Sequence, residues 1–220
     1  MKDYRNSEMN WLAIFYSALT LYFSTNIINI VNSYSEGEFS LFAKVFESVF
    51  ATSIIPLFVY IADSCISSKA KNWLLGSCIL KPYGNTVFSD IVSEKFKDER
   101  IDCKTVKEHF SNIIKNSPKD PKEKCKYENE QWYKLYSSLE ENAAVKQTQK
   151  DWLAFRDLYC ETIVFIFTYL ISILLFNSIS FSLELLLILL TMTIVFNICS
   201  HIKMKRFVYT VIVKSALSQQ

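Results

Sequence analysis

The sequence predicts an all-α membrane protein, with four transmembrane helices and a helical cytosolic domain inserted between spans 2 and 3. Two apolar runs near the C-terminus are the first observation behind this fold class. They cover residues 162–176 and 185–200, and Glu184 is the only charged residue between Glu161 and His201. Because a helix rises about 1.5 Å per residue, about 20 apolar residues cross a hydrocarbon core about 30 Å thick. With their flanks, both runs are long enough to form a helical hairpin in lipid.

The distribution of charge is the second observation. Residues 86–157 carry fourteen Lys or Arg and fourteen Asp or Glu, whereas residues 9–35 and 48–62 carry no charge. Apolar segments therefore stand before and after a polar middle. We divide the chain into residues 9–68 for transmembrane helices 1 and 2, 69–157 for a cytosolic helical domain, 158–202 for transmembrane helices 3 and 4, and 203–220 for a basic cytosolic tail.

The first pair of spans follows from the N-terminal apolar segments. Span 1 is expected at residues 11–30 as a retained helix, because its uncharged run exceeds the roughly 7–15-residue core of a cleaved signal peptide. Span 2 is expected at residues 43–66, with Lys44 and Asp63 close enough to its ends to reach the headgroups. Pro56 would bend this helix, which a bundle of helices tolerates.

The positions of Lys and Arg predict the orientation of the spans. Residues 33–47, which connect spans 1 and 2, have one Lys against three Glu, and the connection between spans 3 and 4 has no Lys or Arg. The tails and the polar middle are richer in Lys and Arg. Because cytosolic segments retain these residues, we expect both termini and the middle domain on the cytosolic side of the cell inner (plasma) membrane.

Helical periodicity continues through the polar middle. Apolar residues recur every three to four positions in residues 87–96, and Thr105 with Glu108 has the pattern of a capping box that opens a second helix. A third helix is expected near residues 122–139. A fourth, around residues 145–159, has no Gly or Pro between it and span 3. We therefore expect it to enter the membrane without interruption.

Signatures of catalysis are missing from the sequence. It contains no P-loop, GxGxxG, GxSxG or HExxH pattern, and its three glycines, at positions 37, 76 and 84, offer little means to cradle a phosphate. His109 and His201 are isolated, so a metal site cannot be assembled locally. We expect no enzyme, no cofactor and no metal. The polar middle has no net charge, so nucleic acid is not an expected partner either.

Thin polar lines cross three of the predicted spans at helical spacing. Their residues are Thr193, Asn197 and His201 on span 4, Ser17, Thr20 and Ser24 on span 1, and Thr168 and Ser172 on span 3. One interpretation is interhelical hydrogen bonding, which contributes about 0.6 kcal/mol per pair in membrane bundles. The other is a water-filled path that forms when subunits assemble.

Arg156 and Asp157, just before span 3, are either a solvated interfacial pair or a coupling point between the cytosolic domain and the membrane. Adjacent positions on a helix do not face each other. We therefore expect each residue to find a partner elsewhere: Asp63 for Arg156, and Lys69 or Lys71 for Asp157.

A basic cluster follows span 4. Lys203, Lys205 and Arg206 are suited to attract anionic lipid headgroups. The β-branched stretch after them, residues 207–213, fits an interfacial segment, an extension of span 4 or an addition to the cytosolic domain.

The arrangement resembles a broad group of small bacterial membrane proteins with two spans, a helical cytosolic insert and two further spans. Residues 131–136 (QWYKLY) and 152–157 (WLAFRD) are similar to phrases in such chains. Some members of that group are anti-phage defence effectors, in which a cytosolic sensing event triggers membrane disruption. The resemblance implies the same role for this chain.

Three functions follow as hypotheses. The first is an oligomeric inner-membrane effector that perturbs or permeabilises the bilayer when its cytosolic domain senses a protein or small-molecule signal. The second is a non-conducting membrane anchor or scaffold that recruits a cytosolic partner. The third is an integral-membrane enzyme whose reacting residues meet only in the fold.

Overall fold

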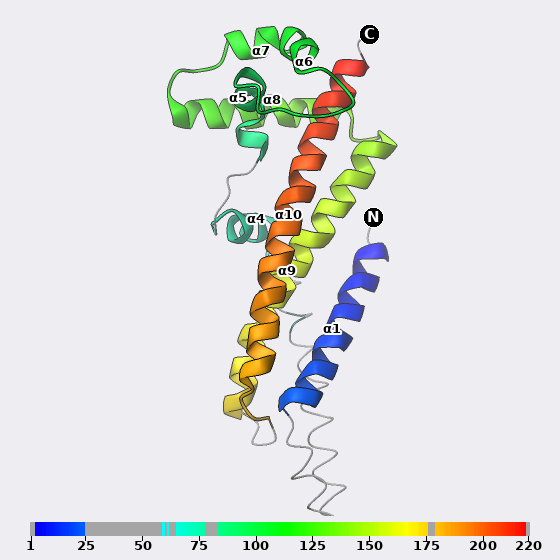
Figure 1. The fold of residues 1–220 in the computed structure, drawn as a ribbon, viewed down its shortest axis with the longest axis vertical. Coiled ribbons are helices and arrows are strands. Elements are labelled where there is room, and N and C mark those ends of the chain that lie inside the picture. Colours follow the sequence, from blue (N-terminus) through cyan, green and yellow to red (C-terminus); the bar gives the residue numbers. More distant parts are fainter. Residues whose placement is uncertain are drawn as a thin grey trace, which may run out of the picture. The chain divides into compact units, whose positions relative to one another are not determined.

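The computed structural model of the protein describes residues 3–24, 59, 61, 65–77, 83–175 and 179–218. The elements found in these ranges are helices, which confirms the predicted all-α class (Figure 1). In chain order they are α1 (Asp3–Ser24), α4 (Ser68–Ser77), the 3-10 helix η2 (Tyr83–Asn85), α5 (Val87–Val92), α6 (Cys103–His109), α7 (Ser111–Lys115), α8 (Pro121–Ser138), α9 (Ala143–Leu175) and α10 (Leu183–Leu217).

The chain divides into two compact units. Unit 1 consists of Met1–Leu75 and Arg156–Ile198, and unit 2 of Gly76–Phe155 and Cys199–Gln220. Both α9 and α10 contribute one part to each unit. Each unit is described by itself below.

Two of the four predicted spans have the length and composition that a bilayer requires. These are α9 and α10, with 33 and 35 residues. The apolar stretch of α1 is Ile14–Phe23, which is shorter than a span. Span 2, predicted at residues 43–66, lies almost entirely outside the described residues. The described part of the chain thus supports two candidate spans and does not support the four-span topology.

Unit 1 has a core in which α1 packs against α9 and α10. Its buried residues include Tyr16, Phe165, Tyr169, Leu185 and Leu189. The ring centroids of Tyr16 and Phe165 lie 4.5 Å apart. A core of this kind fixes which faces of α9 and α10 point inward.

The second helix of the hairpin begins with a polar cap. The Ser182 hydroxyl accepts the backbone N–H of Leu185 at 3.2 Å and donates to the Glu184 carboxylate at 3.0 Å. The Ser182 N–H in turn donates to the Tyr169 hydroxyl at 2.9 Å. Glu184 thus lies in the first turn of α10, where the helix dipole favours a carboxylate.

Unit 2 is built around aromatic rings from three helices. Trp132 and Tyr136 of α8, Trp152 of α9 and Phe207 of α10 lie with their ring centroids 5.5–5.7 Å apart. Aromatic contacts of this geometry add about 0.5–1.5 kcal/mol per pair to the burial of their area. The C-terminal part of α10 is therefore a core element of unit 2, not a solvated tail.

A buried carboxylate joins α8 to α5. Glu128, only 1% exposed, accepts the backbone N–H groups of Phe88 and Ser89 at 3.0 Å each, and the Ser89 hydroxyl donates to its other oxygen. The residue before α5, Thr86, makes no capping bond with its own side chain. Glu128 thus satisfies N–H groups that the first turn of any helix leaves unpaired.

Several predicted helices of unit 2 are confirmed. The helix expected near residues 122–139 is α8, whose Asp120 cap accepts the N–H groups of Lys122 and Glu123 and whose first residue is Pro121. The expected continuation of the fourth helix into span 3 is α9. Residues 207–213, for which three alternatives were open, both extend α10 and add to unit 2.

Two local predictions in unit 2 are wrong. The capping box at Thr105 does not open a helix: α6 begins at Cys103, because the Asp102 carbonyl already accepts the N–H of Val106 at 3.2 Å. The periodic stretch 87–96 is helical only as far as Val92. Its last apolar residue, Phe96, is in a loop but is still buried, because it packs on Tyr209 of α10.

Candidate functional site

A buried group of charged and polar side chains connects α4 with α9 inside unit 1. We call Lys71 and Asn72 of α4 and Arg156 and Asp157 of α9 the charged cluster. Lys71 Nζ lies 3.5 Å from Asp157 Oδ1, and Arg156 donates from Nε and Nη2 to the same oxygen at 3.1 and 2.9 Å. Arg156 Nη1 donates to Asn72 Oδ1 at 3.0 Å. One carboxylate oxygen therefore receives contacts from two cations.

Because these charged side chains are buried, their contacts have a large effect on the free energy of folding. Lys71 and Asp157 are each 2% exposed and Arg156 is 5% exposed. Removing such ions from water costs several kcal/mol each, and only close opposite charges and hydrogen bonds offset that cost. A helix in an apolar unit carries such residues rarely, and where it does they commonly mark a functional position.

The sequence predicted part of this cluster. Lys71 was one of two expected partners for Asp157, and the structure brings them together. Asp63, the expected partner of Arg156, lies outside the described residues. The expectation that Arg156 and Asp157 do not meet is wrong, because the long guanidinium side chain folds back along α9 to its neighbour. Asn72 was missed, since a single Asn in a short polar stretch carries no distinguishing pattern.

A second buried polar contact lies close along α9. Tyr16 of α1 and Thr162 have their hydroxyl oxygens 2.6 Å apart. Thr162 donates its proton to the Leu158 carbonyl at 2.7 Å, so Tyr16 is the donor of the shorter contact. Glu161, next to Thr162, is 2% exposed. The polar interior of unit 1 therefore extends over at least one further turn of α9.

The outer faces of α9 and α10 within unit 1 are apolar, in contrast to the polar interior. Large apolar side chains there are exposed, at fractions between 38% and 85%. They are Phe167, Leu170, Ile171, Leu174 and Leu175 on α9, and Leu183, Leu187, Leu190, Ile194, Val195 and Ile198 on α10. Soluble monomers rarely expose so many contiguous apolar residues. These faces are suited to an apolar neighbour.

The residues of the predicted polar line on span 4 are buried or half-buried. Asn197 is 9% exposed and His201 is 3% exposed, although Asn197 belongs to unit 1 and His201 to unit 2. Thr193 donates to the Leu189 carbonyl of its own helix at 2.8 Å. The Asn197 amide nitrogen is buried and has no hydrogen-bond partner among the residues that the structure describes.

The span 1 line follows the same pattern where it is described. Thr20 is fully buried and donates to the Tyr16 carbonyl at 2.9 Å, and Ser17 is half-buried. The side chain of Ser24 lies outside the described part. Two hydroxyls on α9 behave alike, because Thr168 and Ser172 donate to carbonyls of their own helix.

The three basic residues predicted to bind lipid headgroups differ in the contacts that they make within the protein. Lys203 lies 3.4 Å from Asp151, and Lys205 lies over the rings of Tyr83 and Tyr209 at 5.9 and 5.3 Å. Arg206 is exposed and makes no ion pair with any residue in the described ranges. Of the predicted basic cluster, Arg206 is thus the residue most available to an external anion.

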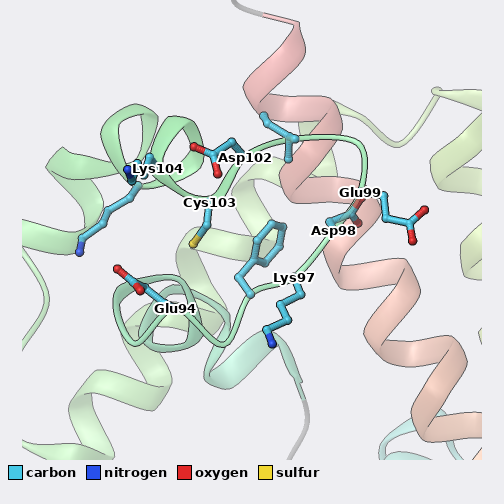
Figure 2. A pocket seen from close by; sticks show the side chains of 10 residues that line it. Glu94, Lys97, Asp98, Glu99, Asp102, Cys103 and Lys104 are labelled. Atoms are coloured by element: carbon cyan, nitrogen blue, oxygen red, sulfur yellow. The ribbon is translucent and has the colours of Figure 1, made fainter.

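Unit 2 contains a hollow beside the loop that joins α5 to α6. Figure 2 shows charged side chains and the Cys103 thiol around it. Within the loop, Arg100 holds Asp98 in an ion pair of 2.6 Å and donates to the Thr210 hydroxyl at 3.3 Å. The hydrogen bond from Arg100 holds the pKa of Asp98 below its ordinary value. This contact attaches the loop to α10.

Metal binding has no support in the described ranges, which contain no group of three or more His, Cys, Asp or Glu placed to hold an ion. No protein-family model matches the chain, and no match was found among curated proteins or solved structures.

Proposed function

We propose that this protein is an integral membrane protein whose α9 and α10 cross the bilayer within unit 1. The observation that carries this proposal is the exposure of large apolar side chains on both helices, with Leu174 at 85% and Ile194 at 61%. In water such faces would drive aggregation, whereas in hydrocarbon they remove the cost of exposure. The length of both helices supports the same interpretation.

The proposed topology follows from the sequence. Residues 11–30 and 43–66 supply two further spans, and unit 2 and both termini face the cytosol of the inner membrane. The Lys and Arg distribution supports this orientation. Exposed Arg206, immediately after the apolar part of α10, supports contact with anionic headgroups.

The proposed role is that of an oligomeric effector, as the resemblance to anti-phage membrane proteins implies. Unit 2 would bind a cytosolic protein or small molecule, and unit 1 would then permeabilise the bilayer. The charged cluster supports such a role, because buried charges held by several partners can adopt a second arrangement at an energetic cost that a ligand can offset. Arg156 and Asp157 are the first residues of unit 1 on α9, directly after the unit 2 part of that helix.

A membrane anchor that conducts nothing is the second candidate. The observation that favours it is the state of the hydroxyls on the polar lines: Thr20, Thr168 and Thr193 all donate to carbonyls of their own helices. Hydroxyls satisfied in this way need no water. The buried amide nitrogen of Asn197 favours the conducting effector instead, because it would donate hydrogen bonds to water in a conduit.

Ion flux across reconstituted vesicles tests the two candidates. Wild-type protein should release a trapped dye or carry current after a trigger, and Asn197→Leu should abolish that release. Ile198→Leu, at the neighbouring lipid-facing position, is the matched control and should leave it unchanged. If no candidate signal ever produces flux from correctly folded protein, the effector is lost and the anchor stands.

Membrane insertion itself has a separate test. Cells expressing the chain should retain it in the membrane pellet after an alkaline wash, which removes peripheral proteins. Recovery of the protein as a soluble monomer without detergent would overturn the proposal in both of its forms.

A further inference from the structure

Two of the four tryptophans lie on the surface of unit 1. Trp73 of α4 is 71% exposed, and Trp11 of α1 is 70% exposed. The other two, Trp132 and Trp152, pack against the buried core of unit 2. Tryptophan is highly buried on average in soluble proteins, whereas in membrane proteins it is enriched where the hydrocarbon meets the headgroups. The exposed rings of unit 1 have the character of residues at that boundary.

The helix α4 has one side bound to α9 and one side exposed. Because a helix turns by about 100° per residue, positions 71 and 75 lie roughly opposite positions 69 and 73. Lys71 and Leu75 are 2% and 0% exposed, and Lys71 Nζ lies 3.5 Å from Asp157 Oδ1. On the other side, Lys69 is exposed and forms no ion pair with any residue in the described ranges. That side therefore presents one aromatic ring and one cation.

The contact between α4 and α9 sets the depth of α4 in the proposed topology. Asp157, which holds Lys71, stands five residues before Thr162, the start of the apolar run 162–176. Five residues of helix cover about 7.5 Å along the axis. The headgroup layer on each side of the hydrocarbon core is about 5–7 Å thick. With α9 across the bilayer, α4 thus lies at the headgroup layer of the cytosolic leaflet.

Trp11 lies at a similar depth. In the proposed topology α1 and α9 both run outward from the cytosol. The hydroxyl oxygens of Tyr16 and Thr162 are 2.6 Å apart, which aligns the two helices at this point. Trp11 precedes Tyr16 by five residues, the same spacing as on α9 between the attachment of α4 and the apolar run. Both exposed tryptophans of unit 1 therefore belong to one level.

We propose that α4 is an interfacial helix, whose exposed side binds anionic phospholipids of the cytosolic leaflet. The Trp73 ring lies at the boundary with the hydrocarbon, and the Lys69 ammonium group lies beside lipid phosphate. Charge complementarity supports this partner, because α4 contains two lysines and no Asp or Glu. The inference rests on the proposed function, since α4 meets lipid only if α9 crosses the bilayer.

A contact of this kind also reaches the charged cluster. The same helix supplies Lys71 and Asn72, which contact Asp157 and Arg156. Lipid bound on the exposed side of α4 therefore helps to fix the position of two residues of that cluster.

Fluorescence quenching tests the position of Trp73, on the full chain in phospholipid vesicles. Trp73→Phe removes one fluorophore, and because this side chain is exposed the packing of α4 is retained. The difference in emission between wild type and this variant reports Trp73. Phospholipids brominated near the headgroup should quench it more strongly than phospholipids brominated near the end of the acyl chain. Acrylamide in the water should quench it only weakly.

A matched control places a tryptophan on unit 2. Tyr133 of α8 is 58% exposed, so the ring introduced by Tyr133→Trp is accessible in the same way as Trp73. Its additional emission should be quenched by acrylamide and by neither brominated lipid.

The lipid charge tests Lys69. When phosphatidylserine replaces part of the phosphatidylcholine, quenching of Trp73 from the headgroup region should increase. Lys69→Gln should abolish this increase. Lys126→Gln, which removes an 81% exposed lysine from unit 2, is the control and should retain it.

An alkaline wash of the same vesicles separates this inference from the proposed function. If the protein is retained but Trp73 responds to the quenchers as the ring in Tyr133→Trp does, only this inference is overturned, and the exposed side of α4 faces water or a soluble partner. Quenching chiefly from the acyl-chain ends, or an unchanged effect of phosphatidylserine in Lys69→Gln, overturns it as well. Loss of the protein in the wash overturns the proposed function and this inference together.

Discussion

Lys71 and Asp157 form a buried ion pair, with Nζ 3.5 Å from Oδ1 and both side chains 2% exposed. Asp157 also accepts two hydrogen bonds from Arg156. The two cations therefore share one carboxylate, and Arg156 is bound to it more closely than Lys71 is. This asymmetry determines what each substitution leaves behind in the interior of unit 1.

Asp157→Asn should destabilise the protein more than Lys71→Met. The first change leaves two buried cations with reduced compensation, for which a cost of about 3–5 kcal/mol is typical, whereas after the second Asp157 retains the guanidinium. The free energy of unfolding of each variant in micelles, measured by denaturant titration, checks the order. An equal or greater loss in Lys71→Met would show that Arg156 does not hold the carboxylate.

Glu128→Ala should lower the free energy of unfolding by about 2–3 kcal/mol, because it leaves the N–H groups of Phe88 and Ser89 without their acceptor. Glu128→Gln keeps one acceptor oxygen and should cost less. The control is Glu130→Ala on the same helix, where the exposed pair with Lys126 contributes little, within about 0.5 kcal/mol. A similar loss in Glu128→Ala and in the control would contradict the capping role.

The ion pair between Asp98 and Arg100 should give a pH-dependent contribution to stability. Because the pKa of Asp98 is lower in the folded chain than its ordinary 3.8, the contribution is present above that pH and is lost as the pH falls through the folded pKa. The difference in unfolding free energy between wild type and Asp98→Asn should therefore shrink between neutral pH and about pH 2. A difference that grows on acidification would refute the sign.

Two glycines should respond differently to substitution by alanine. A Cβ at Gly84 would meet Asn129 Oδ1 at 3.2 Å and Trp132 Cε3 at 3.4 Å, so Gly84→Ala should push η2 away from α8 and lower the melting temperature. A Cβ at Gly76 meets nothing within 4 Å, and Gly76 lies inside α4. Gly76→Ala should be neutral or stabilise by up to about 1 kcal/mol, since alanine has the better helix propensity. Thermal unfolding followed by circular dichroism checks both.

Local signals account for the helices that were predicted correctly. The helix expected near residues 122–139 begins at Pro121, and Asp120 caps it; both features act within one turn. The absence of Gly and Pro predicted an uninterrupted α9 for the same kind of reason. The capping box at Thr105 failed because the residues before it were already helical, and a four-residue pattern does not exclude an earlier start.

The charged cluster contains contacts that local sequence signals do not predict. Asp157 and Lys71 were paired from their opposite charges, but Asn72 could not be chosen, because a neutral amide has no charge that indicates which residue it will contact. The cap that Glu128 places on Ser89 spans 39 positions and leaves no trace in the sequence around either residue. Neither contact produces a periodic pattern within one segment of the chain, so neither can be predicted from such a pattern.

The helical class of this chain, and the length and apolar character of α9 and α10, can be predicted from the order of the amino acids, because helix periodicity and hydrophobicity are properties of consecutive residues. The folded arrangement was needed to show that the C-terminal part of α10 packs in the aromatic core of unit 2, and that Lys71 and Arg156 both contact Oδ1 of Asp157. Those outcomes depend on which helix faces meet. The free energy of that packing comes from contacts between distant segments, which composition and spacing do not specify.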